Sequence, residues 1–160
     1  MAAVVARSLA EAFSLRAAAT QLLLPSSPDL ACMNMMCEHV GAGCACRLSL
    51  TLERMPLLAH LDVGGNRLPQ LPPALFQLPN LRLLAAPSNA ITALPAGVGG
   101  ARALEELDLR HNQLAALPLE ALEALPALRR LRLGGNPLPP SLCAALKASP
   151  LAARGVLELE

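Results

Sequence analysis

The chain has 160 residues, of which 54% are hydrophobic and only 1% are aromatic, and its formal net charge is +1. So small a charge provides no field that would attract nucleic acid or an anionic membrane, and a chain without Trp or Tyr offers bases almost nothing to stack on. The length fits one domain, and we expect neither nucleic acid nor a membrane as a partner.

Residues 1–28 are rich in alanine and precede the repetitive part of the chain. Val5, Leu9 and Phe13 follow one another at a spacing of four, which places them on one face of a predicted amphipathic helix. The charged positions of this segment are Arg7, Glu11 and Arg16. They interrupt any apolar run and so argue against a secretory signal. Two interpretations stay open: a cap or disordered extension before the first coil, and an organelle transit peptide.

Residues 29–47 contain most of the cysteines of the chain. The weak candidates for metal ligands are Cys32, Cys37, His39, Cys44 and Cys46. Thiolate and imidazole groups are the usual zinc ligands, but the spacing is C-x₄-C and C-x-C rather than the C-x₂-C of a zinc knuckle. A disulfide-bonded cap is a further alternative, although reduced thiols are expected in the absence of a secretory signal. We predict a cap or a degenerate first repeat with a strand near residues 38–40, and neither a metal nor another cofactor.

Between residues 48 and 138 the eleven-residue pattern L-x-x-L-x-L-x-x-N-x-L occurs four times. Its asparagines are Asn66, Asn89, Asn112 and Asn136, at intervals of 23, 23 and 24 residues. Leucines two residues apart, such as Leu107 and Leu109, predict a short strand with one buried face. The asparagine at the following turn can hydrogen-bond backbone groups of the neighbouring coil, so we predict that the four form a structural ladder.

The run from Asn66 to Leu81 resembles the 23-residue LPxxL repeats of intracellular, Ras-group and scaffold-type leucine-rich-repeat proteins. The resemblance covers about residues 48–146 and is weaker in the second repeat, where Ala86 replaces a leucine and Gly99-Gly100-Ala101 replaces a bulky pair. It implies an α/β solenoid, with a short curved parallel sheet on the concave side and short helical or 3₁₀ turns on the convex side. It also implies a protein-binding role and an intracellular, cytoplasmic location, with an organelle as the alternative.

Residues 139–160 end the repeats. We expect a helix over residues 141–147 with Ser141 as its N-cap and Pro150 as its stop. Residues 156–160 alternate like a strand, and Leu157 is expected to correspond to Leu131 in a terminal strand of the sheet. The outer edge of such a strand could pair with another chain, including a second copy of this one. A fragment of a longer repeat protein is a further possibility.

The outward residues of the strands form the predicted binding surface on the concave face. They are His60, Asp62, Leu83, Ala85, Pro87, Glu106, Asp108, Arg110, Arg130 and Arg132. Parallel neighbours lie about 4.8 Å apart, so Glu106 is expected to meet Arg130 and Asp108 to meet Arg132. These charges could simply satisfy one another, each exposed pair contributing under about 1 kcal/mol. Alternatively they form a bipolar patch, beside an apolar one, that binds a protein or peptide.

No residue pattern predicts catalysis. The chain has no G-x-S-x-G, H-E-x-x-H or G-x-x-x-x-G-K-[ST] sequence. His60 and His111 belong to strands with another strand between them, about 10 Å apart by the strand spacing. We therefore predict a non-catalytic protein-interaction module. The alternative is a structural solenoid, or a fragment of a longer repeat protein, that assembles through its terminal edge at Val156–Glu160.

Overall fold

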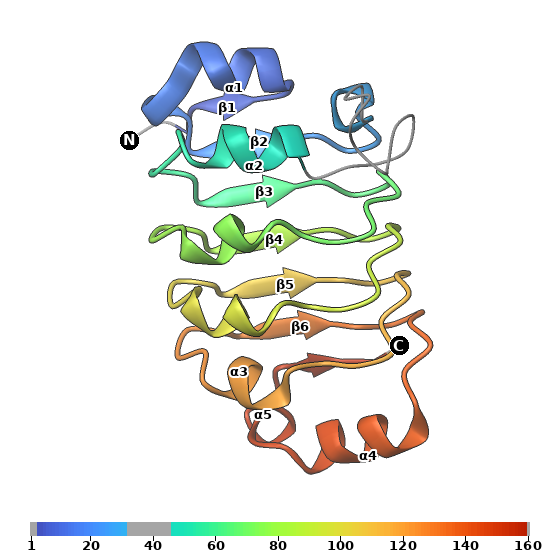
Figure 1. Ribbon diagram of the computed structural model, residues 1–160. Coiled ribbons are helices and arrows are strands. Elements are labelled where there is room, and N and C mark those ends of the chain that lie inside the picture. Colours follow the sequence, from blue (N-terminus) through green and yellow to red (C-terminus); the bar gives the residue numbers. More distant parts are fainter. Residues whose placement is uncertain (1–2, 32–45, 160) are drawn as a thin grey trace.

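The computed structural model describes residues 3–31 and 46–159, which form a stack of coils around an open parallel sheet (Figure 1). Seven strands follow one another in the sheet in the order of the chain. They are β1 (Val5–Ala6), β2 (Gln21–Leu23), β3 (His60–Asp62), β4 (Leu83–Ala85), β5 (Glu106–Asp108), β6 (Arg130–Arg132) and β7 (Leu157–Glu158). Every neighbouring pair is parallel. The predicted α/β solenoid with a short parallel sheet is confirmed.

The inward row of the sheet is apolar and continuous. Its members, each in register with the next, are Leu22, Leu61, Leu84, Leu107 and Leu131. All are buried, whereas most residues that flank them in the strands are partly exposed, as the period of two requires. Each coil thus buries its leucines against the next coil, which is how a chain almost without aromatic residues builds a core.

The second layer consists of short helices and 3₁₀ turns on the other side of the coils. They are α1 (Leu9–Leu15), η1 (Arg16–Ala18), η2 (Pro28–Leu30), α2 (Cys46–Leu52), η3 (Pro73–Gln77), η4 (Ala96–Gly100), α3 (Leu119–Glu123), α4 (Pro140–Ala148) and α5 (Pro150–Ala153). Proline precedes η3, η4 and α3 directly, at Pro72, Pro95 and Pro118. Because the residue before a proline disfavours the helical conformation, none of these helices can begin earlier in the chain.

The weak second repeat has a packing explanation. A Cβ atom at Gly100 would lie 3.0 Å from the backbone oxygen of Phe76, closer than an ordinary van der Waals contact, so glycine favours the close approach of these two coils. Phe76 is fully buried in η3, and Val98 and Ala101 are fully buried in the next coil. Both coils therefore contribute buried side chains to the core at this point.

The four asparagines form a ladder along one rim of the sheet. The Asn112 amide nitrogen donates to the carbonyl oxygens of Leu109 in its own coil, at 3.0 Å, and of Ala86 in the preceding coil, at 2.9 Å. Its side-chain oxygen accepts from the Ile91 N–H at 3.1 Å. Asn66, Asn89 and Asn136 repeat this arrangement. Each asparagine thus ties its coil to the one before it.

The first 28 residues are organised differently from the prediction. Val5 lies in β1 rather than in a helix, and the helix α1 buries Leu9 and Ala12. Phe13 is 53% exposed, with the Arg54 guanidinium 5.0 Å from its ring centroid. The expected Val5–Leu9–Phe13 face is therefore wrong, because sheet pairing with β2 takes Val5 out of the helix. The segment covers the first end of the stack, as a cap does (Figure 1).

The strand beside β3 is β2, which belongs to a coil that the repeat pattern did not reveal. Leu22 pairs with Leu61, and Ser27 takes the place of an asparagine by donating its N–H to the Asn66 side-chain oxygen at 2.7 Å. Ser27 and Asn66 are 39 residues apart, whereas Asn66 and Asn89 are 23 apart. The strand expected near residues 38–40 lies outside the described residues, as do all the cysteine-rich segment's candidates except Cys46, the first residue of α2.

The C-terminal end agrees with the prediction only in part. Leu157 pairs with Leu131, so the expected terminal strand and its register are confirmed. The helix α4 ends at Ala148, before Pro150, as expected. Pro139 rather than Ser141 precedes it, with Pro140 as its first residue, and Pro150 also begins a further short helix, α5. Proline is favourable at the first position of a helix, which explains both differences. Within the part of the chain described here, no helix has the length and apolar character needed to cross a bilayer.

Candidate functional site

The strands present two outward rows on the concave face. The first row, in register from β3 to β6, is His60, Leu83, Glu106 and Arg130. The second row, from β3 to β7, is Asp62, Ala85, Asp108, Arg132 and Glu158. The structure therefore brings eight of the ten residues predicted for this surface into two adjacent rows. Pro87 and Arg110 follow the ends of β4 and β5.

The middle of this face is small and apolar. Leu83 and Ala85 are partly exposed, and the short Ala85 side chain borders a hollow of about 50 Å³. The hollow is lined by Leu83, Leu84, Ala85, Glu106, Leu107, Asp108, Arg130 and Arg132. Apolar residues of β4 line one side of the hollow, and charged residues of β5 and β6 line the other side. The hollow can therefore accept a small group from a partner.

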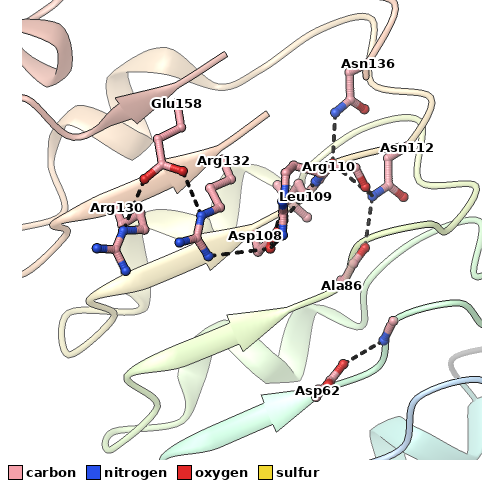
Figure 2. A network of polar contacts seen from close by, with 11 residues as sticks. Asp62, Ala86, Asp108, Leu109, Arg110, Asn112, Arg130, Arg132, Asn136 and Glu158 are labelled. Carbon is pink, nitrogen blue, oxygen red and sulfur yellow. Dashed lines mark hydrogen bonds and ion pairs between the residues drawn. The ribbon is translucent and has the colours of Figure 1, made fainter. Parts of the chain in front are cut away.

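Ion pairs cover the part of the face nearest the C-terminus (Figure 2). Arg130 pairs with Glu106 at 3.0 Å, and Arg132 with Asp108 at 3.7 Å, which confirms both pairings expected from the sequence. Glu158 in β7 bridges the two arginines, with its carboxylate oxygens 3.2 Å from Arg130 Nε and 2.8 Å from Arg132 Nε. The predicted bipolar patch is therefore one connected network.

Asp108 is the most constrained carboxylate of this network. Its oxygens accept hydrogen bonds from Arg110 Nη2 at 2.7 Å and Nε at 3.0 Å, and from the Arg110 backbone N–H at 3.1 Å. Burial raises the pKa of Asp108, but these hydrogen bonds and the charges of Arg110 and Arg132 outweigh it, so the pKa lies below its usual value. The same contact raises the pKa of Arg110.

Glu158 was not among the predicted site residues. A signal for it was present, because a strand that aligns Leu157 with Leu131 necessarily places Glu158 beside Arg132. As a charged residue of the terminal strand, Glu158 makes the open edge less prone to pairing with another chain. Its bridge to Arg130 and Arg132 gives it a second role, which is to fasten β7 to the concave face.

Asp62 differs from the other carboxylates of the face. Its Oδ1 accepts the Gly64 N–H at 2.9 Å, the same turn that Asp108 makes with the Arg110 N–H. Among the described residues no cationic side chain lies within ion-pair distance of Asp62, which stands apart from the network in Figure 2. Its charge is therefore available to a partner.

His60 and His111 lie in different parts of the structure and do not form a common site with Asp62. His60 lies in β3, whereas His111 follows β5 in a left-handed conformation with φ 54°, at the position before Asn112. A Cβ atom on Gly135 would collide with the His111 ring, so the imidazole lies against the next coil. No group of three potential metal-binding side chains occurs in residues 3–31 and 46–159.

Known proteins match this chain in its repeats, and the matching region is a small part of each of these relatives. Residues 79–138 match the family model for leucine rich repeats. Geranylgeranyl transferase type-2 subunit alpha of Homo sapiens is 46% identical over 88 residues, which are 54% of this chain and 15% of that protein. Podocan-like protein 1 of Mus musculus is 37% identical over 120 residues, covering 71% of this chain and 21% of that protein. The chain thus spans at most about one fifth of either relative.

Solved structures match between 69% and 88% of the chain. A leucine-rich-repeat protein of Leptospira interrogans aligns with 69% of this chain and 27% of its own, with a TM-score of 0.62 and 32% identity. An internalin of Listeria monocytogenes covers 88% of this chain and 34% of its own, at a TM-score of 0.61 and 20% identity, which shows the fold alone. The Toll–Spatzle complex of Drosophila covers 70% of this chain and 16% of its own, with a TM-score of 0.56 and 28% identity.

Proposed function

Because this chain is a leucine-rich-repeat solenoid, a fold that serves in general for protein interaction, we propose that it is a non-catalytic module that binds a protein partner on its concave face. The observation that carries the proposal is the surface at the centre of that face. There Leu83 and Ala85 are partly exposed beside a hollow, next to a network of ion pairs. The Toll–Spatzle complex, a structural neighbour, pairs its own repeat protein with a protein ligand.

The size of the surface sets the expected strength of binding. The strands are three residues long or shorter, so a partner contacts a narrow strip. Interfaces below about 1,200 Å² are typical of weak or transient complexes. We therefore propose transient binding of an extended segment or loop, with His60, Asp62, Leu83, Ala85 and Pro87 as the contacting residues.

The proposal is tested with a variant in which a large side chain occupies the hollow beside Ala85. Ala85→Trp places a bulky side chain at the centre of the concave face, and Ala96→Trp makes the same change at an exposed position in η4 on the convex side. Wild type and both variants, each checked for folding by circular dichroism, are used to capture proteins from a cell lysate for mass spectrometry. Partners that disappear only with Ala85→Trp support the proposal, whereas identical sets for all three proteins contradict it.

A second candidate function is assembly through the terminal strand. β7 pairs on one side only within the described sheet, and a hollow of about 560 Å³ beside it is lined by Lys147, Ala152, Gly155, Leu157, Glu158 and Leu159. An open strand edge favours pairing with a strand of another copy, and the hollow beside it, which has both apolar and charged lining residues, leaves room for one. Light scattering tests this candidate: Leu159→Lys should then reduce the mass of an oligomer that Ala85→Trp leaves intact.

The location is also part of the proposal. The resemblance to intracellular LPxxL repeats supports a cytoplasmic site of action, and the N-terminal excess of arginine over acidic residues supports the organelle alternative. Fluorescence microscopy of the chain with a C-terminal tag distinguishes the two. A cytoplasmic signal that deletion of residues 1–18 leaves unchanged supports the first, and an organelle signal lost on that deletion supports the second.

A further inference from the structure

The carboxylates of the concave face are not equivalent. Glu106, Asp108 and Glu158 each contact at least one arginine of the face, at 3.0, 2.7 and 2.8 Å respectively. Among the described residues, the Gly64 N–H is the one donor to the Asp62 carboxylate. The arginines are correspondingly occupied, because each of the three on this face already contacts a carboxylate of the same chain. The unsatisfied charge of the face is therefore negative and lies at β3.

We propose that Asp62 binds an arginine or lysine side chain of the partner, so that the concave face recognises a basic extended segment. This inference rests on the proposed function and names the chemistry of its partner. An acidic partner would compete with Glu106, Asp108 and Glu158 for arginines whose charge these carboxylates already neutralise. A basic partner displaces nothing, because the carboxylate it meets has no cation of its own among the described residues.

The surroundings of Asp62 fit such a segment. Asp62 is in register with Ala85 on the neighbouring strand, and the short Ala85 side chain leaves the space above it open. The hollow lies on the far side of Ala85 from Asp62 and is lined by residues of β4, β5 and β6. With strands about 4.8 Å apart, its near part, beside β4 and β5, begins about 5 Å from the Asp62 row and lies within about 10 Å of it.

That distance predicts a sequence pattern in the partner. Alternate side chains of an extended chain are about 6.6 Å apart and point to the same side. A segment that crosses the strands can therefore place a basic side chain at Asp62 and, two residues further on, a small apolar side chain in the hollow. The alkyl part of the basic residue would lie along Ala85, as lysine and arginine stems do on apolar surfaces. The expected motif is basic, any residue, small apolar.

The experiment selects ligands from a random library, so the partner need not be identified first. Phage that display random linear heptapeptides are enriched on the immobilised wild-type protein, and the enriched peptides are synthesised with a fluorescein label for anisotropy titration. The variant Asp62→Asn keeps an oxygen that can accept the Gly64 N–H but has no charge. The matched control is Glu120→Gln, which removes one exposed charge in α3 on the convex side.

We expect enriched peptides to carry the motif and to bind Asp62→Asn about five- to tenfold more weakly than wild type or Glu120→Gln, since a partly desolvated charge-assisted contact is lost. Replacing the basic peptide residue with alanine should weaken binding to the wild-type protein by the same factor. The same replacement should weaken binding to Asp62→Asn little further, because the contact is already lost in that variant, as a double-mutant cycle requires. Added salt should weaken binding to wild type more than to Asp62→Asn.

The outcomes separate this inference from the proposed function. Peptides that lose affinity for Ala85→Trp but bind Asp62→Asn as tightly as wild type would overturn the basic-partner inference and leave the concave-face function standing. An acidic or uncharged consensus would do the same. Failure to enrich any peptide, or enriched peptides that bind Ala85→Trp unchanged, would count against both.

Discussion

Asn112 shows how one residue type holds neighbouring coils together. Its side chain makes four hydrogen bonds, to backbone groups of Ala86, Leu109, Arg110 and Ile91, and the residue is only 5% exposed. Asn112→Ala removes these bonds and leaves the Ile91 N–H without its partner, so we expect a loss of about 1–3 kcal/mol in the free energy of unfolding, measured by urea denaturation. Gln113→Ala, at the exposed next position, is the control and should change it by less than about 0.5 kcal/mol. Equal effects would contradict a ladder role for Asn112.

Asp108 gives the stability a pH dependence with a defined sign. Its pKa is lower in the folded state than its ordinary value of 3.8, so its contribution is present above that value and disappears as the pH falls through the lowered pKa. Asp108→Asn should therefore unfold more easily at pH 7 by about 1 kcal/mol, a modest figure because Arg110 is partly exposed. The difference from wild type should shrink below about pH 4, as thermal unfolding across a pH series would show. A constant difference would be inconsistent with this account.

At the scale of the element, β7 depends on side chains as well as on backbone pairing. Glu158 accepts from Arg132 through its side chain at 2.8 Å and from the Leu133 N–H through its backbone oxygen at 2.9 Å. Glu158→Ala should loosen β7, so we expect faster hydrogen exchange at the Leu133 amide, measured by NMR. The global free energy of unfolding should fall by less than about 1 kcal/mol, because the Glu158 side chain is 49% exposed. An unchanged rate of hydrogen exchange at the Leu133 amide would mean that backbone pairing alone holds the strand. Lys147→Ala is a suitable control.

For the coil that contains β2, at the N-terminal end of the sheet, we predict the stability lost when a buried leucine is truncated. Leu22 is fully buried in the inward row next to Leu61, like Leu84 further along. Leu22→Ala should therefore cost about 2–4 kcal/mol of unfolding free energy, comparable to Leu84→Ala. Thermal and urea denaturation of both variants would measure this. A much smaller loss for Leu22→Ala would show that residues 1–28 are an extension rather than part of the fold.

This coil also shows where the sequence stopped being informative. Four coils were predictable because leucine and asparagine recur at intervals of 23 and 24 residues, and register alone then placed Glu106 beside Arg130. In the first coil Ser27 replaces the asparagine, and the interval to the next coil is 39 residues, so neither the motif nor the period survives. Backbone hydrogen bonds form without the consensus side chains, and such pairing leaves little trace in a sequence.

For the whole molecule, the order of strands in the sheet equals their order in the chain, so contacts link nearest neighbours. That simplicity made the two rows of the concave face predictable. What the sequence could not supply was the state of each charge. The hydrogen bonds from Arg110 to Asp108 depend on side-chain rotamers, and Glu158, which pairs with Arg132, lies in a coil with an irregular interval of 26 residues.

The unequal coil lengths have a consequence for engineering. Closing a loop of 39 residues instead of 23 costs only about 0.5 kcal/mol more in chain entropy, since that cost grows with the logarithm of loop length. Chain closure therefore contributes little to the stability of this coil, and the buried residues of η2 and α2, such as Leu30 and Leu48, contribute more. An affinity tag or a fluorescent reporter inserted at the exposed Glu53, after α2, would spare these buried residues while the partner-facing rows on β3 to β6 kept their native sequence.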